Sequence, residues 1–214
     1  MHERKKIAKP KMIALCLFLI ALAVFFDQYT KYLAVSNLKD QNAYVLIDKV
    51  LELYYIVNIG SSWGMLAGQK ALILFISAVI VALCIFMIFK SPEDVKFIPF
   101  NISLSMIIAG GIGNGIDRIR YSYVIDFIYF KAINFPVFNV ADIFVSLAFL
   151  SFLFLLVFVY NEDEFNKCFG NFKKKEAVKE TAEAKEETKE ETKEEPAAET
   201  ESAEETEATQ EEPS

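Results

Sequence analysis

The sequence predicts an all-α integral membrane protein: a four-transmembrane-helix bundle with a small extracytoplasmic β-sheet and a disordered C-terminal tail. The 214-residue chain is 54% apolar and contains 20 Phe, a share that is too high for an ordinary soluble domain of this size. Four separate stretches approach the roughly 20 mostly apolar residues that a bilayer-spanning helix requires. Two connections between these stretches have strand-like composition, and the chain ends in a long polar segment.

The first expected span follows a basic arm, residues 1–11, and begins with the unbroken apolar run Met12–Phe26. This arrangement also resembles a secretory signal peptide. However, Asp27 and Lys31 interrupt the stretch where a signal peptide stays apolar, which favours a retained helix over a cleaved one. The four spans are expected at about 12–35, 71–89, 97–116 and 140–160, within one membrane domain, residues 12–160.

The later spans differ in polarity. The second is interrupted only by Ser77, and the third is rich in small residues at its end, in the run Ala109–Gly113. The fourth carries Asp142 near its start. A charged side chain within a membrane span is costly and is retained mainly for function, so the start of the fourth span is a candidate site.

Lysines and arginines predict the direction of the spans. They are concentrated in the N-terminal arm, in the short connection between the second and third spans, and after the fourth span. Cytoplasmic segments carry this excess of basic residues. Four spans with two basic ends therefore place both termini in the cytoplasm and the connections 36–70 and 117–139 outside.

This topology brings the polar residues of the spans to one face of the membrane. The first and third spans run outward and the fourth begins outside, so their acidic and amide residues lie near the outer interface. The two outer connections add one amide and one acid. The residues gathered in this way are Asp27, Asn58, Asn114, Asp117, Asp126, Asn139 and Asp142.

The outer connections predict a small sheet. Val50–Val57 and Tyr123–Phe130 are rich in β-branched and aromatic residues, which is typical of strands. Asn58–Gly64 follows as a turn that leads into a short amphipathic segment. Within it, Trp63 is either an interfacial anchor or a substrate contact, since aromatic residues favour the membrane interface.

The segment 161–214 is expected to be a cytoplasmic tail that is acidic and disordered from about residue 173. From Lys173 onward the chain has 7 Lys against 16 Glu, whereas residues 1–172 have 15 Lys and Arg against 13 Asp and Glu. A segment with so few large apolar residues cannot bury enough surface to fold. The nearly neutral body has no basic patch for nucleic acid, which excludes that class of partner.

Histidine and cysteine chemistry is not expected. The single histidine, His2, lies in the N-terminal arm, and the spacing of the three cysteines, Cys16, Cys84 and Cys168, matches neither a zinc site nor a disulfide framework. The sequence therefore predicts no metal, no other cofactor, and no nucleophile activated by histidine.

Five short motifs occur in order between the expected spans. They are Asp27–Lys31, Asn58–Gly60, Gly111–Arg118, Val124–Phe127 and Phe138–Asp142. Each motif alone is weak, but the ordered set, covering roughly residues 10–160, resembles the bacterial lipoprotein signal peptidases, also called signal peptidase II, of aspartyl protease family A8.

The resemblance implies a catalytic pair, Asp126 and Asp142. It implies a membrane aspartyl endopeptidase that removes signal peptides from prolipoproteins, cutting before a cysteine that carries diacylglycerol. Two close carboxylates do not readily both ionise, so one activates water while the other holds a proton. The expected location is the bacterial inner membrane, with the active site at the outer interface, membrane lipids as surroundings, and a monomeric state.

The resemblance also implies supporting residues around the pair. Amides are expected to orient the two acids, and Arg118 to meet a substrate carbonyl oxygen or a lipid phosphate. The family pattern Asn-x-Gly-Ala-Ala-Phe-Gly stands here as Asn58–Gly64 with Ser61, Ser62 and Trp63. The supporting or substrate-binding residues are Asp27, Lys31, Asn58, Gly60, Gly113, Asn114, Asp117, Arg118, Asn139 and Ala141.

Other interpretations remain open on the residues alone. A small transporter or proton channel would also use membrane carboxylates, although it predicts acids spread through the membrane depth. A Ser-Lys peptidase would pair Ser61 or Ser62 with Lys31 or Lys70. Structural interpretations also exist: an Asp117–Arg118 ion pair, an Asp27–Lys31 pair, Asp142 as a helix N-terminal charge, and Asp126 as a solvated loop acid.

Overall fold

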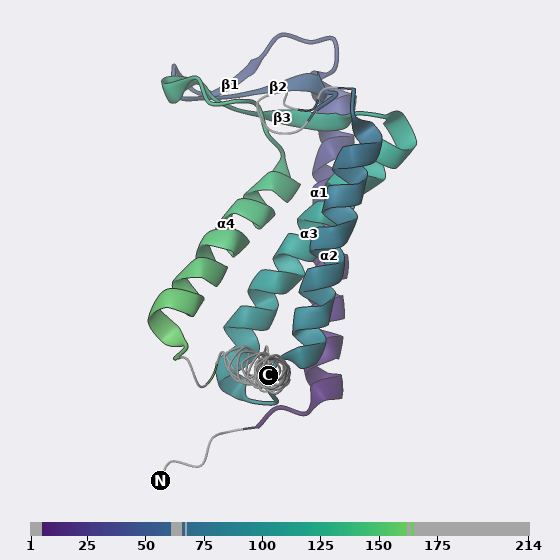
Figure 1. The fold of residues 1–214 in the computed structure, drawn as a ribbon. Coiled ribbons are helices and arrows are strands. Elements are labelled where there is room, and N and C mark those ends of the chain that lie inside the picture. The colour runs from purple at the N-terminus through teal and green to yellow at the C-terminus, as the bar shows by residue number, and fades with distance from the viewer. Residues whose placement is uncertain (1–5, 61–65, 67, 162–163, 165–214) are drawn as a thin grey trace, which may run out of the picture. The chain divides into compact units, whose positions relative to one another are not determined.

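Four long helices dominate the computed structural model, which describes residues 6–60, 66, 68–161 and 164 (Figure 1). Each helix, with the short turns that extend two of them, is long and apolar enough to cross a membrane. This confirms the predicted four-helix membrane class. The helices are α1 (Lys9–Leu38), α2 (Lys70–Lys90), α3 (Ile98–Tyr121) and α4 (Val140–Phe154), with a 3₁₀ turn, Val95–Phe97, before α3 and a π-helical turn, Leu155–Val159, after α4.

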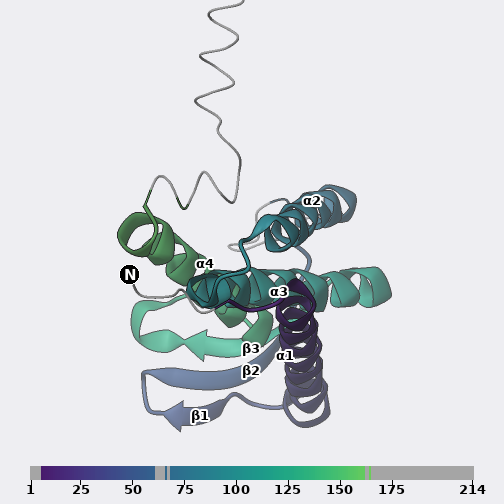
Figure 2. The ribbon, with the colours of Figure 1, turned by 90° about the horizontal axis from the view of Figure 1, so that it is seen from below.

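Helix α3 lies in the centre of the bundle and packs against each of the other three helices (Figure 2). Glycines make this close packing possible. A Cβ atom at Gly110 would lie 2.7 Å from the carbonyl oxygen of Ala141 on α4, and one at Gly113 would lie 2.5 Å from the carboxylate of Asp27 on α1. Small residues at helix interfaces allow this approach in membranes, so α3 is the element from which the site is built.

A three-stranded antiparallel sheet, ordered β1-β2-β3, crosses one end of the helices (Figure 1). The expected strands 50–57 and 123–130 are β2 (Leu51–Asn58) and β3 (Val124–Phe130), and β1 (Tyr44–Ile47) was not expected. The register pairs Ile56 with Asp126. The sheet therefore holds Asp126 above the start of α4.

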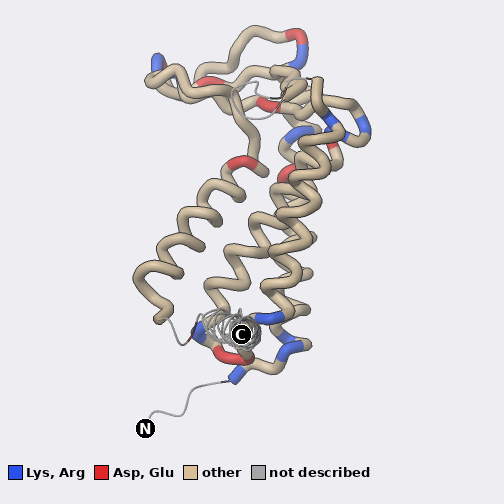
Figure 3. Tube along the Cα trace, viewed as in Figure 1, with Lys and Arg blue, Asp and Glu red and all other residues tan. Residues whose placement is uncertain are grey.

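Charged residues gather at the two ends of the bundle, and the helices between them are almost free of charge (Figure 3). Large apolar side chains such as Phe18, Phe75 and Phe158 are more than 60% exposed. Contact between such side chains and lipid tails is favourable, whereas their exposure to water is unfavourable. At the end away from the sheet, Lys9 Nζ donates to the carbonyl oxygens of Ile88 and Ser91, where α2 terminates.

Helix α3 continues to Tyr121, so Asp117 and Arg118 lie on a helix, although the expected outer connection began at residue 117. Arg118 and Arg120 in its last turn favour a helix C-terminus, and Ser122 ends the helix in the left-handed conformation with φ of 68°. The expectations for Ser61, Ser62, Trp63 and the tail from residue 165 lie outside the described residues.

Candidate active site

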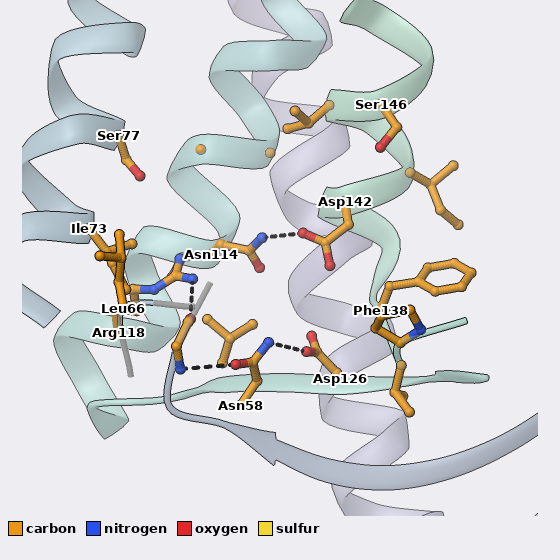
Figure 4. Close-up of a pocket in the computed structure, with 18 of the residues that line it drawn as sticks. Asn58, Leu66, Ile73, Ser77, Asn114, Arg118, Asp126, Phe138, Asp142 and Ser146 are labelled. Carbon is orange, nitrogen blue, oxygen red and sulfur yellow. Dashed lines mark hydrogen bonds between the residues drawn. The ribbon is translucent and has the colours of Figure 1, made fainter. Parts of the chain in front are cut away.

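The two predicted catalytic acids meet at the sheet end of the bundle. Asp126 lies in β3, Asp142 lies in the first turn of α4, and both line one cavity of about 930 Å³ (Figure 4). Asp126 is only 2% exposed. The interpretation of Asp126 as a solvated loop acid is therefore wrong, because the strand pairing and the helices below remove its carboxylate from water.

Two amides hold Asp126. Asn58 Nδ2 donates to Asp126 Oδ2 at 2.8 Å, and Asn139 Nδ2 donates to Asp126 Oδ1 at 2.6 Å. Burial raises the pKa of Asp126 to about 6, and the negative charge of Asp142 adds to this rise, while the two amides oppose it. The pKa is raised overall because hydrogen bonds to the ionised form only partly offset its desolvation.

Asp142 has a double role in the geometry. Its Oδ2 accepts the backbone N–H of Asn139 and its own N–H donates to Asn139 Oδ1, each at 3.1 Å, which forms a capping box at the start of α4. Its Oδ1 accepts from Asn114 Nδ2 at 2.8 Å. Asp142 is thus a helix N-terminal charge, as one interpretation held, and also a cavity acid. Asn139 contacts both acids and fixes one relative to the other.

Lys31 is the centre of a buried polar cluster below the acids. Its ammonium group lies 3.0 Å from Asp27 Oδ2 and 2.9 Å from Asp117 Oδ2, and it donates to Asn114 Oδ1 at 2.8 Å. These three acceptors match the three donors of an ammonium group, and Lys31 is only 2% exposed. The expected Asp27–Lys31 pair is present. Because Lys31 holds the amide oxygen of Asn114, the amide nitrogen is directed at Asp142.

The two acids of this cluster tie the surrounding elements together. Asp27 Oδ1 accepts the backbone N–H of Ala141 at 2.9 Å, which joins α1 to the first turn of α4. Asp117 Oδ2 accepts the backbone N–H of Ile125 at 3.2 Å, which joins α3 to the strand residue before Asp126. Gly113 provides the space for Asp27. The cluster therefore fixes the backbone beside both Asp126 and Asp142.

Arg118 is joined to the pair through a chain of hydrogen bonds. Its Nη2 donates to the carbonyl oxygen of Gly60 at 3.1 Å, and the N–H of Gly60 donates to Asn58 Oδ1 at 3.0 Å (Figure 4). Within the described residues no ion pair joins Arg118 to Asp117, so that interpretation is wrong. Adjacent residues on a helix point in different directions, and Asp117 turns to Lys31 instead.

The sequence interpretation overlooked Gln28. Its Nε2 lies within hydrogen-bond distance of Asp27 Oδ2, Asp117 Oδ1 and the carbonyl oxygen of Gly113. Gln28 precedes Lys31 by three residues, so the two share a face of α1. The sequence did contain a signal for Gln28: it is a third polar residue, with Asp27 and Lys31, within about one turn of an apolar span.

The competing interpretations fit this geometry poorly. Lys31 is held by two carboxylates and is not a free base, and Lys70 donates to Ser122 Oγ at 3.1 Å in an exposed position. Ser61 and Ser62 are outside the described residues. Among the described residues of the four helices, the acids Asp27, Asp117 and Asp142 all lie at the sheet end, whereas a proton channel predicts acids along the whole membrane depth.

The rest of the cavity is largely apolar, with the hydroxyls of Ser77 and Ser146 in its lining, and it follows the bundle away from the sheet. Residues of α2, α3 and α4 form its walls. Its polar end is formed by Asn58, Gly60, Asn114, Arg118, Asp126 and Asp142, and its apolar walls include Ile73, Ile76, Ile80, Val81, Ile107, Ile143, Val145 and Leu147.

A family profile described as signal peptidase (SPase) II matches residues 19–158, which include every residue of the site described above. The chain belongs to this family. A signal peptidase II is an aspartic endopeptidase, and its location is a membrane that it crosses several times. The acid pair at the cavity agrees with that class.

Relatives and solved structures support the family. The chain is 39% identical over 145 residues to a lipoprotein signal peptidase of Caldanaerobacter subterraneus subsp. tengcongensis, covering 67% of this chain and 97% of the relative. It is 35% identical over 150 residues to that of Clostridium tetani, covering 69% and 93%. A bacterial membrane enzyme solved by the in meso method at 1.9 Å is 26% identical, with a TM-score of 0.62, covering 74% of this chain and 100% of that one.

Proposed function

We propose that this signal peptidase II removes the signal peptide from diacylglyceryl-modified prolipoproteins and cleaves before the lipidated cysteine. The observation that carries the proposal is the convergence of Asp126 and Asp142 at the polar end of an otherwise apolar cavity. A membrane-anchored precursor presents its scissile bond near the interface and its apolar parts in the bilayer. In the cavity, the two acids can act on the scissile bond, and the apolar walls can contact the apolar parts of the precursor.

The proposed reaction uses the two acids as a pair that shares one proton. The ionised carboxylate takes a proton from a bound water, and the water oxygen attacks the scissile carbonyl carbon while the protonated carboxyl donates to the carbonyl oxygen. The tetrahedral intermediate then collapses, and the leaving amine takes a proton from the pair. The products are a signal peptide with a new carboxylate and a lipoprotein with a free cysteine amine.

The supporting residues have positioning roles in this proposal. Asn58, Asn114 and Asn139 hold the carboxylates by the hydrogen bonds described above, so that the pair is ordered before substrate binds. Arg118 lines the cavity beside the pair. Its guanidinium group suits a substrate carbonyl oxygen or a lipid phosphate, both of which accept hydrogen bonds.

The proposed orientation places both termini in the cytoplasm and the sheet outside. The described basic residues of the N-terminal arm and those of the connection between α2 and α3 lie at the end opposite the sheet (Figure 3), and basic residues favour the cytoplasmic side. The active site then faces the outer interface, where an exported precursor arrives. The protein is proposed to act as a monomer, since both acids come from one chain.

The substrate class is tested with purified protein and two synthetic precursors that differ only in diacylglycerol on the cysteine. The lipidated precursor is expected to be cleaved before the cysteine, with kcat/KM at least roughly a hundredfold above that of the unlipidated one, because remote binding energy improves positioning. Mass spectrometry identifies the products. Equal cleavage of both precursors, or cleavage at another bond, would contradict the proposal.

The pH dependence follows from the raised pKa of Asp126. The pair needs one proton, and the carboxyl with a pKa of about 6 loses it as the pH rises. We expect kcat/KM to fall above about pH 6, by roughly tenfold per pH unit where a single proton is lost. Asn58→Ala removes a hydrogen bond that lowers this pKa, so the alkaline limb should move to higher pH.

The control for this pH profile is Asn37→Ala. Asn37 is exposed, and among the described residues it donates to the carbonyl oxygen of Leu33 on its own helix, so this variant should keep the wild-type profile. A shift of the Asn58→Ala limb to lower pH would show that the Asn58 amide does not stabilise the ionised form of Asp126.

A further inference from the structure

We infer that Ser77 of α2 and Ser146 of α4 form a hydroxyl subsite that binds the unwound backbone of the signal peptide just before the scissile bond. The inference rests on the proposed function and assigns a role to residues outside the acid pair and its supporting amides. Both serines line the catalytic cavity, on two different helices (Figure 4). Each serine places a hydroxyl group among the apolar side chains that its helix contributes to the cavity.

The two hydroxyls stand out from their surroundings. Ser77 is the only hydroxyl-bearing residue of α2, and it shares one helix face with the cavity residues Ile73 and Ile80. Among the described residues, none accepts a hydrogen bond from Ser77 Oγ or Ser146 Oγ. By contrast, Ser151 Oγ, further along α4, is bonded to Ser103 Oγ at 3.1 Å. Ser77 is half-buried and Ser146 is exposed, so both hydroxyls are open to a group that enters the cavity. When a substrate covers them, a hydroxyl left without a partner is costly, so the two are suited to a polar group of that substrate.

The position of Ser146 defines which part of the substrate it meets. Ser146 follows Asp142 by four residues, so it lies on the same face of α4 and about 6 Å further from the sheet, at 1.5 Å per residue. In Figure 4, Ser77 and Ser146 lie on the side of Asp142 away from Asp126 and β3. An extended chain rises about 3.3 Å per residue. The subsite therefore meets the backbone about two residues before the scissile bond.

The substrate needs such a subsite because it must unwind. An α-helical signal peptide satisfies its own backbone groups, but a helical scissile carbonyl is hydrogen-bonded and shielded from water. Extending the residues before the cleavage point frees N–H and C=O groups in an apolar region, where each unsatisfied group costs several kcal/mol. A hydroxyl both donates and accepts, so one serine on each wall satisfies either kind of backbone group.

The test combines enzyme variants with substrates that carry an ester in place of a peptide bond. Esters replace, in turn, the two peptide bonds before the scissile one, which removes an N–H donor and weakens the carbonyl acceptor. For the lipidated precursor, Ser77→Ala and Ser146→Ala are each expected to lower kcat/KM by roughly tenfold, since an unpaired polar group is left in the complex. At one or both positions the ester should cost the wild type a similar factor.

The decisive comparison is the coupling between the two changes. In the Ser77→Ala/Ser146→Ala variant the ester is expected to cost much less than in the wild type, because its partner is already gone. Ser151→Ala is the matched control and should keep both the wild-type kcat/KM and the full ester penalty. Ser146→Thr, which retains a hydroxyl, should restore most of the activity lost in Ser146→Ala.

Three outcomes would overturn the inference. They are wild-type kcat/KM in both serine variants, an ester penalty that is equal in the wild type and the double variant, and a loss in Ser151→Ala as large as that in Ser146→Ala. Each leaves the proposed function intact, because the wild type still cleaves the lipidated precursor. Failure of the wild type to cleave that precursor would instead overturn the proposed function, and the serine subsite with it.

Discussion

Asp126→Asn and Asp142→Asn are each expected to lower kcat for the lipidated precursor by at least roughly a thousandfold. Asparagine keeps the size of the side chain but neither takes up nor releases a proton, and general acid–base groups contribute about 10²–10⁴-fold each. Two groups that act as a unit lose nearly all activity when either is removed, so the double variant should be little worse than the single ones.

The controls for this result separate chemistry from folding. Glu52 is a sheet acid paired with Lys131 at 2.6 Å, and Glu52→Gln should retain most of the activity. Asp126→Asn and Asp142→Asn should also unfold in the same thermal range as the wild type in detergent. A folded single variant that cleaves at the wild-type rate would remove that residue from the catalytic pair and would favour a structural role for it.

The membrane spans were predictable from the sequence because the bilayer imposes a simple rule. A span needs about 20 apolar residues, and each expected span lies largely within one of the helices α1 to α4. The class of the site was predictable for a related reason: an acid such as Asp142 is costly in a span and carries its own signal. Its capping box with Asn139 is also a local pattern of the sequence.

The contacts between helices were not predictable in the same way. Spacing within one helix predicts the Asp27–Lys31 neighbours, but the second acid of Lys31, Asp117, comes from another helix whose rotation depends on packing. The same is true of the Asn114 oxygen that Lys31 holds. The short strand β1 was missed because its four residues, Tyr44–Ile47, are all exposed and show no alternation of apolar and polar side chains.

Lys31→Met is expected to lower the stability of the protein by about 3–5 kcal/mol, the range for removing one partner of a buried ion pair. Lys31 is 2% exposed, and its loss leaves the carboxylates of Asp27 and Asp117 close together in the bundle without a cation. The unfolding midpoint in detergent should fall by roughly 10 °C. Lys131→Met removes a cation from an ion pair with Glu52 in which the lysine is 48% exposed, and the midpoint should change far less.

The same substitution should also lower activity at temperatures where the variant is folded. Lys31 and Asn139 Nδ2 both donate to Asn114 Oδ1, at 2.8 and 3.0 Å, and this directs Asn114 Nδ2 at Asp142. Without the ammonium group the amide loses the charged one of its two donors, so its orientation is held less firmly. The triple variant Asp27→Asn/Lys31→Met/Asp117→Asn removes the uncompensated charges and should recover much of the stability. It should not recover the full activity, because the ammonium donor to Asn114 is still missing and only the Asn139 amide remains. Recovery of both together would mean that Lys31 acts only through folding and has no positioning role toward the proposed catalytic pair.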